Sequence, residues 1–281
     1  MFAEFINTLR KLRGSILGWG IGLFLYDLLI ASMYSSIIEM GDSLQAMLSS
    51  YPEEMLAFFP SIAEFTSPVG FMDTYFSAYM TFIIGIFAAG AAGRLVVGEE
   101  ESGILDLVMS YPVSRTKLFF GRFLAYLSAL AIILLACWLG WVIPAESAGI
   151  PLTAFEMLLP ILPLFAVLFV FGGLGLLLSL VMPSSKLAGG LAGGLLVGNF
   201  LLVGLSNLNE DLQPFFEVTP LYFYQGAKII EDPNWGWMLG LIGVGLIFVA
   251  AAWLIFLRRD IRVGGEAGWQ LPLLSLRKTA E

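Results

Sequence analysis

The sequence predicts an all-α integral membrane protein with six transmembrane helices in one domain, residues 1–281. Of its residues, 58% are hydrophobic and only 13% are charged, whereas soluble domains average about 45–50% apolar and about 25% charged residues. Six stretches of largely charge-free residues follow one another, each near the roughly 20 residues that a helix needs to cross a bilayer. A β-barrel would instead show alternating segments of about ten residues.

The predicted spans cover residues 15–38, 74–93, 119–143, 157–182, 187–208 and 235–257. Ahead of the first span, Phe2, Phe5, Ile6 and Leu9 recur with helical spacing beside several bases. This pattern predicts an amphipathic helix over residues 1–13 in the membrane interface. Such a helix either anchors the first span or holds a partner. The segment between the first two spans is too apolar for a disordered linker and predicts short helices.

Lys and Arg residues are distributed asymmetrically between the loops on the two sides of the membrane. All of the 14 Lys and Arg residues except Lys228 lie at the termini, in the links that follow spans two and four, or, for Arg122, in the first turn of the third span. Because bases near span ends are retained in the cytosol, both termini are predicted to be cytoplasmic, in a multi-pass protein of the cell membrane. More than half of the 22 acids lie on the opposite side. They either attract cations or reflect only the exclusion of bases.

The link between spans two and three, residues 98–115, reads GEEESGILDLVMSYPVSR and is both charged and amphipathic. Apolar residues recur with helical spacing from Ile104 to Tyr111, and Pro112 prevents the helix from continuing. The acids Glu99–Glu101 are predicted at or just before its first turn, where carboxylates favour the helix dipole. The segment therefore predicts a short helix with a defined start and stop.

A second helix is predicted to begin directly after this one. Ser114 is a good N-cap, and Val113 and Leu118 are spaced as a hydrophobic staple. This helix would continue into the third span, so that a movement of the link reaches the membrane domain. Three successive acids would be repelled by an anionic lipid surface, which favours docking to a protein over a helix that only lies on the bilayer.

The run GEEESGILDLVMSYPVSRTKLFFGR resembles the signature of type 2 ABC transporter permeases, the six-span membrane subunits of ABC exporters. TPLYFYQGA before the last span is similar to the S-P-[FL]-Y-Y-Y segment of that family, and the resemblance covers essentially the whole chain. Ile104, Thr219 and Phe223 are mild departures from the family pattern. The resemblance implies an ATPase-facing coupling region that includes Glu99, Glu100, Glu101, Gly103, Leu105, Asp106, Leu107, Pro112 and Arg115.

The resemblance also implies a dimer of permease subunits that works with two cytoplasmic ABC ATPase subunits, to which ATP and Mg would bind. The chain has no G-x-x-x-x-G-K-[ST] phosphate loop, so it is predicted to bind no cofactor and to carry no ATPase site. The fifth span contains three overlapping G-x-x-x-G pairs, which allow close helix approach either within one subunit or between two. The resemblance assigns this face to the dimer interface, with Gly189, Gly190, Gly193, Gly194 and Gly198.

Two polar residues inside spans are candidates for a translocation path, Asp27 and Asn199. Intramembrane acids often serve proton relays, so a proton-coupled secondary transporter that uses Asp27 is an alternative, and a scaffold that transports nothing is another. The simpler interpretation of Asp27 is a carboxyl group that is hydrogen-bonded to a Tyr or Ser of a neighbouring span. With no histidine and one cysteine, neither a metal site nor a His-based catalytic site is expected. Nothing predicts a nucleic-acid partner, and the sequence does not select a substrate.

Overall fold

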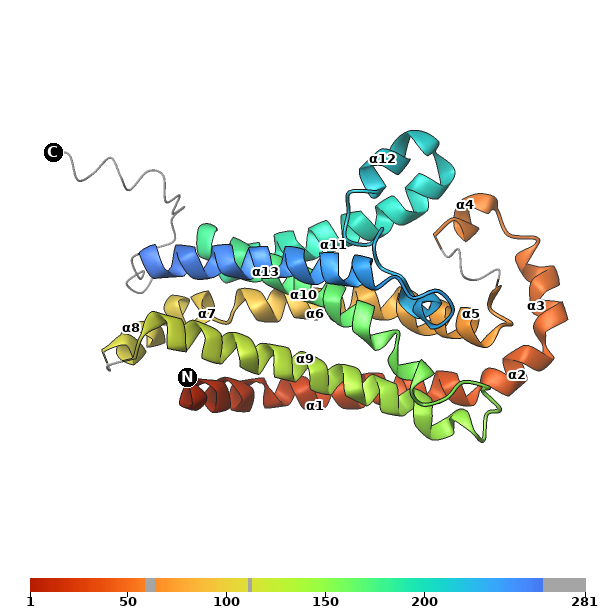
Figure 1. The fold of residues 1–281 in the computed structure, drawn as a ribbon, viewed down its shortest axis with the longest axis horizontal. Helices are drawn as coiled ribbons and strands as arrows, with labels where there is room; N and C mark the ends of the chain where they lie inside the picture. The colour runs from red at the N-terminus through yellow and green to blue at the C-terminus, as the bar shows by residue number, and fades with distance from the viewer. Residues whose placement is uncertain (59–63, 111–112, 260–281) are drawn as a thin grey trace.

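The computed structural model describes residues 1–58, 64–110 and 113–259, and all regular structure within them is helical (Figure 1). Within these residues, six helical stretches are long and apolar enough to cross a membrane, in agreement with the predicted number. They are Phe2–Ser32, Pro68–Gly93, Arg115–Ala145, Glu156–Val181, Ser185–Leu208 and Trp235–Arg258.

The long helices are α1 (Phe2–Ser32), α6 (Ala78–Gly93), α9 (Arg115–Ala145), α10 (Ile161–Val181), α11 (Ser185–Leu208) and α13 (Trp235–Arg258). Short helices connect them: α2 (Tyr34–Glu39), α3 (Gly41–Leu48), α4 (Glu53–Leu56), α5 (Pro68–Met72), the π-helical turn η2 (Asp73–Ser77), α7 (Val97–Glu101), α8 (Ile104–Met109), η3 (Glu156–Leu158), η4 (Glu210–Leu212), α12 (Gln213–Phe216) and η5 (Gly226–Ile230). The short helices predicted between the first two spans are α2 to α4.

Three predicted boundaries differ from the structure. The first span was predicted to reach residue 38, but α1 ends at Ser32 and the separate helix α2 follows it. Residues 1–13 are not a distinct helix but the first turns of α1, which runs without a break from Phe2 to Ser32. Gly14 and Ser15 do not end it, because neither residue removes a backbone donor as proline does. The second span starts earlier than predicted, at Pro68, since Ser67 caps α5 and the helix continues through η2 into α6.

Helix α10 lies at the centre of the bundle and is its most buried span. It packs against α6, α11 and α13, while α1 packs along α9. A close approach of α1 and α9 is possible because Gly140 has no side chain. A Cβ atom there would lie 2.7 Å from the Phe24 carbonyl oxygen, so a larger residue would separate the two helices.

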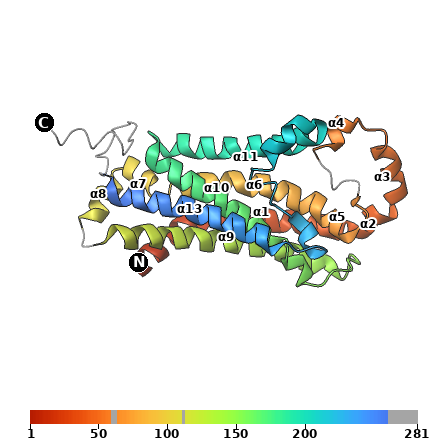
Figure 2. The same ribbon diagram turned by 45° about the horizontal axis from the view of Figure 1, so that its top comes forward.

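The short helices gather at the two opposite ends of the bundle. One end carries α7, α8, the N-terminus and the last turn of α13, and is called the α7–α8 end (Figure 1). The other carries α2 to α5 and α12, and is called the α2–α5 end (Figure 2). Among the described residues, Lys228 is the only base at the α2–α5 end. The tail bases Arg262, Arg277 and Lys278 lie outside the described residues.

Candidate functional site

The link between spans two and three forms two short helices that meet at a glycine. Helix α7 ends at Glu101, and Gly103 adopts a left-handed backbone with φ of +71° before α8 begins at Ile104. A left-handed backbone conformation is energetically unfavourable for residues that have a side chain. Glycine has none and adopts it without this cost. The three glutamates lie in α7, just before the helix that starts at Ile104, which is one of the two placements that the sequence predicted.

The predicted start of the next helix is confirmed. The Ser114 hydroxyl accepts a hydrogen bond from the Lys117 amide at 3.3 Å, as an N-cap does, and α9 runs from Arg115 into the third span. One continuous helix thus joins the link to the membrane domain.

Glu99 binds two bases, one from α9 and one from α1. Its carboxylate pairs with Arg122 and with Lys11. Arg122 is almost completely buried, and it also donates to Glu4 Oε2 at 3.3 Å and to the Leu95 carbonyl at 3.0 Å. A buried guanidinium needs such partners, because an unpaired charge away from water is costly. Glu99 therefore connects the link to the first and third spans.

Glu100 pairs with Arg259, which directly follows α13. The two side chains are only 1% and 6% exposed. Arg259 donates a further hydrogen bond to the Leu180 carbonyl of α10 at 2.8 Å. This buried pair connects the link to the fourth and sixth spans.

Glu101 holds the first residue of the fifth span. Its two carboxylate oxygens accept from the Ser185 amide and the Ser185 hydroxyl, each at 2.6 Å. The first amides of a helix lack partners within the helix, and the positive end of the helix dipole favours an anion. Glu101 thus caps α11 from another part of the chain.

Arg115 does not extend toward solvent but binds the end of α13. It donates to the Phe256 carbonyl at 2.9 Å and to the Arg259 carbonyl, and its guanidinium lies 5.8 Å from the centre of the Phe256 ring. Cations near a helix C-terminus are favoured by the helix dipole. Arg115 therefore fixes the start of α9 to the end of α13.

The remaining residues of the predicted coupling region divide by exposure. Ile104 is 45% exposed, whereas Leu105 is fully buried. Pro112 lies outside the described residues, and so do the side chains of Asp106 and Leu107. Of the described apolar residues in the link, Ile104 thus offers the most surface to a partner.

The five glycines of the fifth span fall into two sets. Gly189 packs against α6, where its Cβ would lie 3.2 Å from Gly90 Cα, and Gly193 is buried. Gly190, Gly194 and Gly198 are exposed and face open space. Because they are spaced four residues apart, they form one stripe along α11. Only this second set is available to contact another molecule.

Asp27 is fully buried between α1 and α9, where Trp141 Nε1 donates to its Oδ1 at 3.2 Å. The Asp27 carboxyl is therefore hydrogen-bonded to a neighbouring span, as the simpler interpretation expected, but the donor is a tryptophan and not a Tyr or Ser. Asn199 accepts from the Leu221 amide at 3.2 Å and fixes the segment before the last span. A role of either residue in a translocation path stays a prediction.

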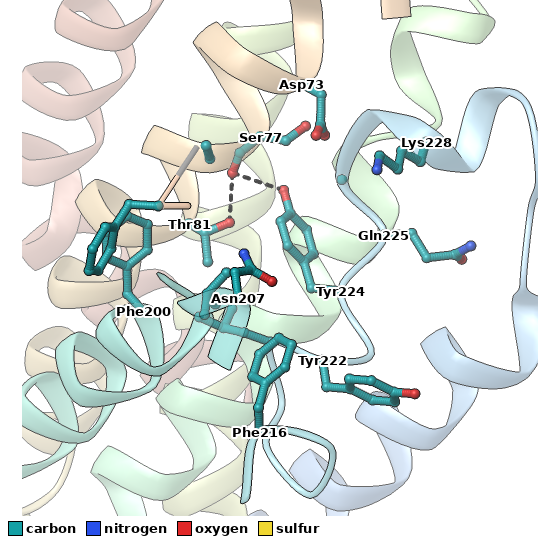
Figure 3. Close-up of a pocket in the computed structure, with 15 residues that line it drawn as sticks. Asp73, Ser77, Thr81, Phe200, Asn207, Phe216, Tyr222, Tyr224, Gln225 and Lys228 are labelled. Carbon is teal, nitrogen blue, oxygen red and sulfur yellow. Dashed lines mark hydrogen bonds between the residues drawn. The ribbon is translucent and has the colours of Figure 1, made fainter. Parts of the chain in front are cut away.

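A cavity of about 260 Å³ opens at the α2–α5 end, between α6, α11 and the segment 219–228 (Figure 3). The turn η2 contributes Asp73 and Ser77 to its wall, and Tyr224 donates from its hydroxyl to the Ser77 carbonyl at 3.1 Å. Burial raises the pKa of Tyr224, so this hydroxyl stays protonated at neutral pH. Sequence reasoning did not find this cavity, although TPLYFYQGA was its signal.

Within the described residues, the six long apolar helices define the class of a multi-pass membrane protein. The ABC-2 family transporter protein profile matches residues 3–261, and the chain belongs to this family. It is the membrane permease subunit of an ABC transporter, and ABC-2 permeases carry no ATPase site and pair with separate ABC ATPase subunits. A comparison with curated proteins found no match. The family assignment does not define the transported substrate.

Proposed function

We propose that this permease works as a homodimer with two cytoplasmic ATPase subunits, which bind ATP and Mg, and that it exports its solute. Export is supported by the resemblance of residues 98–122 to exporter permeases. A cytosolic α7–α8 end is supported by the distribution of bases, since every described Lys and Arg except Lys228 lies there and bases near span ends are retained in the cytosol. Both termini would then be cytoplasmic.

One observation carries the proposed mechanism: three consecutive glutamates bind the ends of different spans. Glu99 reaches α9 and α1, Glu100 reaches the residue after α13, and Glu101 reaches the first residue of α11. Closure of the ATPases would press on α8, and α7 would pass this movement to all of these helices together. The glutamates serve as the connection inside the permease, and the docking surface lies elsewhere on the link.

The docking surface is centred on Ile104. Its side chain is half-exposed beside the buried Leu105, so a partner would gain an apolar contact next to a rigid anchor. Fully desolvated apolar residues of this kind carry much of the binding free energy in protein interfaces. Position 104 is Ile, whereas Thr is common there in the family pattern. This difference is consistent with a contact surface that is matched to the particular ATPase of this permease.

The dimer face consists of the open stripe on α11 and the outer face of α1. Gly190, Gly194 and Gly198 allow a close helix crossing. On α1, apolar side chains at helical spacing are exposed, namely Leu17, Ile21, Leu25 and Leu29. Together the two surfaces provide small and large residues that can interdigitate across a subunit boundary.

Thiol labelling tests the orientation. The natural Cys137 is buried, so a cysteine introduced at an exposed position reports its own side of the membrane. A membrane-impermeant maleimide should label Lys228→Cys in intact cells and Lys186→Cys, at the exposed start of α11, only after permeabilisation. The opposite pattern would overturn the assigned orientation.

Purification of the tagged permease from its native membranes tests the docking surface. We expect an ABC ATPase in equal chain number, and Ile104→Glu should reduce its recovery at least about tenfold, as loss of an interface anchor does. Ile104→Leu is the matched control and should retain the ATPase. Glu101→Gln should retain the ATPase but reduce transport per ATP hydrolysed. Equal recovery with Ile104→Glu would exclude the proposed docking surface.

A further inference from the structure

The cavity at the α2–α5 end has an apolar part and a polar part. Aromatic and aliphatic side chains line one part, namely Phe58, Phe200, Val203, Phe216 and Leu221. The other part is lined by Asp73, Ser77, Thr81 and Lys228. Ligand sites typically combine a mostly apolar lining with a few polar groups that fix orientation. At about 260 Å³, this one is smaller than the roughly 300–1,000 Å³ of sites for drug-sized ligands.

The Ser77 hydroxyl is a hydrogen-bonding group without a partner among the described residues. Ser77 is 1% exposed and lines the cavity, yet its Oγ makes no hydrogen bond. Its carbonyl, in contrast, accepts from the Thr81 hydroxyl at 2.9 Å and from Tyr224 at 3.1 Å (Figure 3). A buried polar group left unpaired costs about 1–3 kcal/mol. The backbone of Ser77 is fixed, while its hydroxyl is left for a ligand.

Opposite charges occupy the polar part of the cavity. Asp73 Oδ1 accepts from the Ala227 amide at 2.7 Å, which fixes the carboxylate in place. A carboxylate has about four lone-pair positions, so the hydrogen bond from Ala227 uses only one of them. Lys228 is exposed and makes no ion pair within the described residues, and Figure 3 shows its ammonium directed toward the side of the cavity where Asp73 lies.

The polar wall has an uncommon backbone geometry. Asp73 and Ser77 are the first and last residues of the π-helical turn η2, and single π-helical turns inside α-helices are frequent at functional sites. Gly226, with φ of +56°, lies directly on this wall, and a Cβ there would come within 2.9 Å of Ser77 Cβ. The segment 219–228 is therefore fixed against η2, and the cavity is formed before any ligand binds.

We propose that this cavity binds a small zwitterionic solute with an apolar side chain, of the chemical class of a free aromatic or aliphatic α-amino acid. The ligand ammonium pairs with Asp73, its carboxylate pairs with Lys228 and accepts from the Ser77 hydroxyl, and its side chain lies against Phe200 and Phe216. The proposal depends on the proposed function only for placing the site at the outer face of the membrane. Binding itself is independent of the ATPase.

The test uses the purified permease in discs of phosphatidylglycerol, without ATPase, with labelled L-phenylalanine as the probe. Binding should be saturable, and millimolar L-phenylalanine should raise the melting temperature, because a ligand that binds only the folded state stabilises it. Phenylalaninamide lacks the carboxylate and hydrocinnamate lacks the ammonium. Each should bind roughly tenfold to a hundredfold more weakly, as expected for the loss of a hydrogen bond to a charged group.

Two variants separate a ligand contact from a structural role. Lys228→Gln should weaken L-phenylalanine at least about tenfold but leave phenylalaninamide unchanged, because that probe has no carboxylate. Lys186→Gln, an exposed lysine at the α7–α8 end, is the matched control and should change neither. Ser77→Ala should weaken L-phenylalanine binding without lowering the melting temperature of the free protein, since it removes a hydroxyl that has no partner.

Several results would overturn the proposal. The proposal fails if L-phenylalanine does not bind, if L-phenylalanine and phenylalaninamide bind equally well, or if Lys228→Gln leaves the affinity for L-phenylalanine unchanged. A zwitterionic lipid headgroup has the same two charges, so phosphatidylethanolamine is then added to the discs. Undiminished binding supports a free solute, whereas competition would assign the site to the headgroup and overturn the free amino acid as its ligand.

Discussion

The buried ion pair between Glu100 and Arg259 allows a quantitative prediction. The two side chains are 1% and 6% exposed, and Arg259 also donates to the Leu180 carbonyl. Glu100→Gln keeps the volume and one acceptor but removes the carboxylate charge that pairs with the guanidinium. Removing one partner of a buried pair costs about 3–5 kcal/mol. We expect Glu100→Gln to lower the free energy of unfolding by about 3 kcal/mol. This is the low end of the range, because the glutamine oxygen retains a hydrogen bond.

Equilibrium unfolding in mixed detergent and SDS micelles, followed by tryptophan fluorescence, measures this change. Arg259→Gln and the double variant complete a mutant cycle. The ion pair can be lost only once, so the double variant should be no less stable than the less stable of the two single variants. The coupling free energy between Glu100 and Arg259 should be at least about 2 kcal/mol. Glu217→Gln, an exposed acid at the α2–α5 end, should stay within about 0.5 kcal/mol of the parent. Additive losses in the double variant would refute the reasoning.

Three further variants test single features by direct measurement. Ser114→Ala removes the cap of α9 and should cost about 1 kcal/mol in the same titration; Ser114→Asp should restore it, and equal losses in both would argue against a cap. Gly103→Ala places a side chain at φ of +71° and should cost about 1–2 kcal/mol, with a smaller loss for Gly103→Asn. Gly194→Leu should reduce the dimer fraction in light scattering; Gly240→Leu, at another open glycine, should not, and equal effects would exclude the α11 stripe.

Local sequence signals predicted the local structure well. Charge-free length identified the six spans, and the order of Val113, Ser114 and Leu118 identified the start of α9, because caps and spans depend on residues close together in the chain. The first boundary was missed for the same reason. Helical spacing over residues 1–13 does not reveal whether the helix continues, and α1 runs through Gly14 unbroken.

The contacts of the link could not be predicted, because they join residues far apart in the sequence. Glu100 and Arg259 are 159 positions apart, and Glu101 and Ser185 are 84 positions apart. The sequence showed an acidic cluster, which suggested a protein partner for the acids. In the structure these carboxylates bind groups of the same chain. The cavity was missed because η2 and Gly226 create it only when the second span and the segment before the last span come together.

Cross-linking from position 104 shows whether the link is the docking element for an ATPase. Ile104→Cys would be treated in native membranes with a bifunctional maleimide and the products identified by mass spectrometry. We expect an adduct with an ABC ATPase chain from Ile104→Cys and none from Lys228→Cys at the opposite end. Complete modification of the cysteine at position 104 without any ATPase adduct would contradict it.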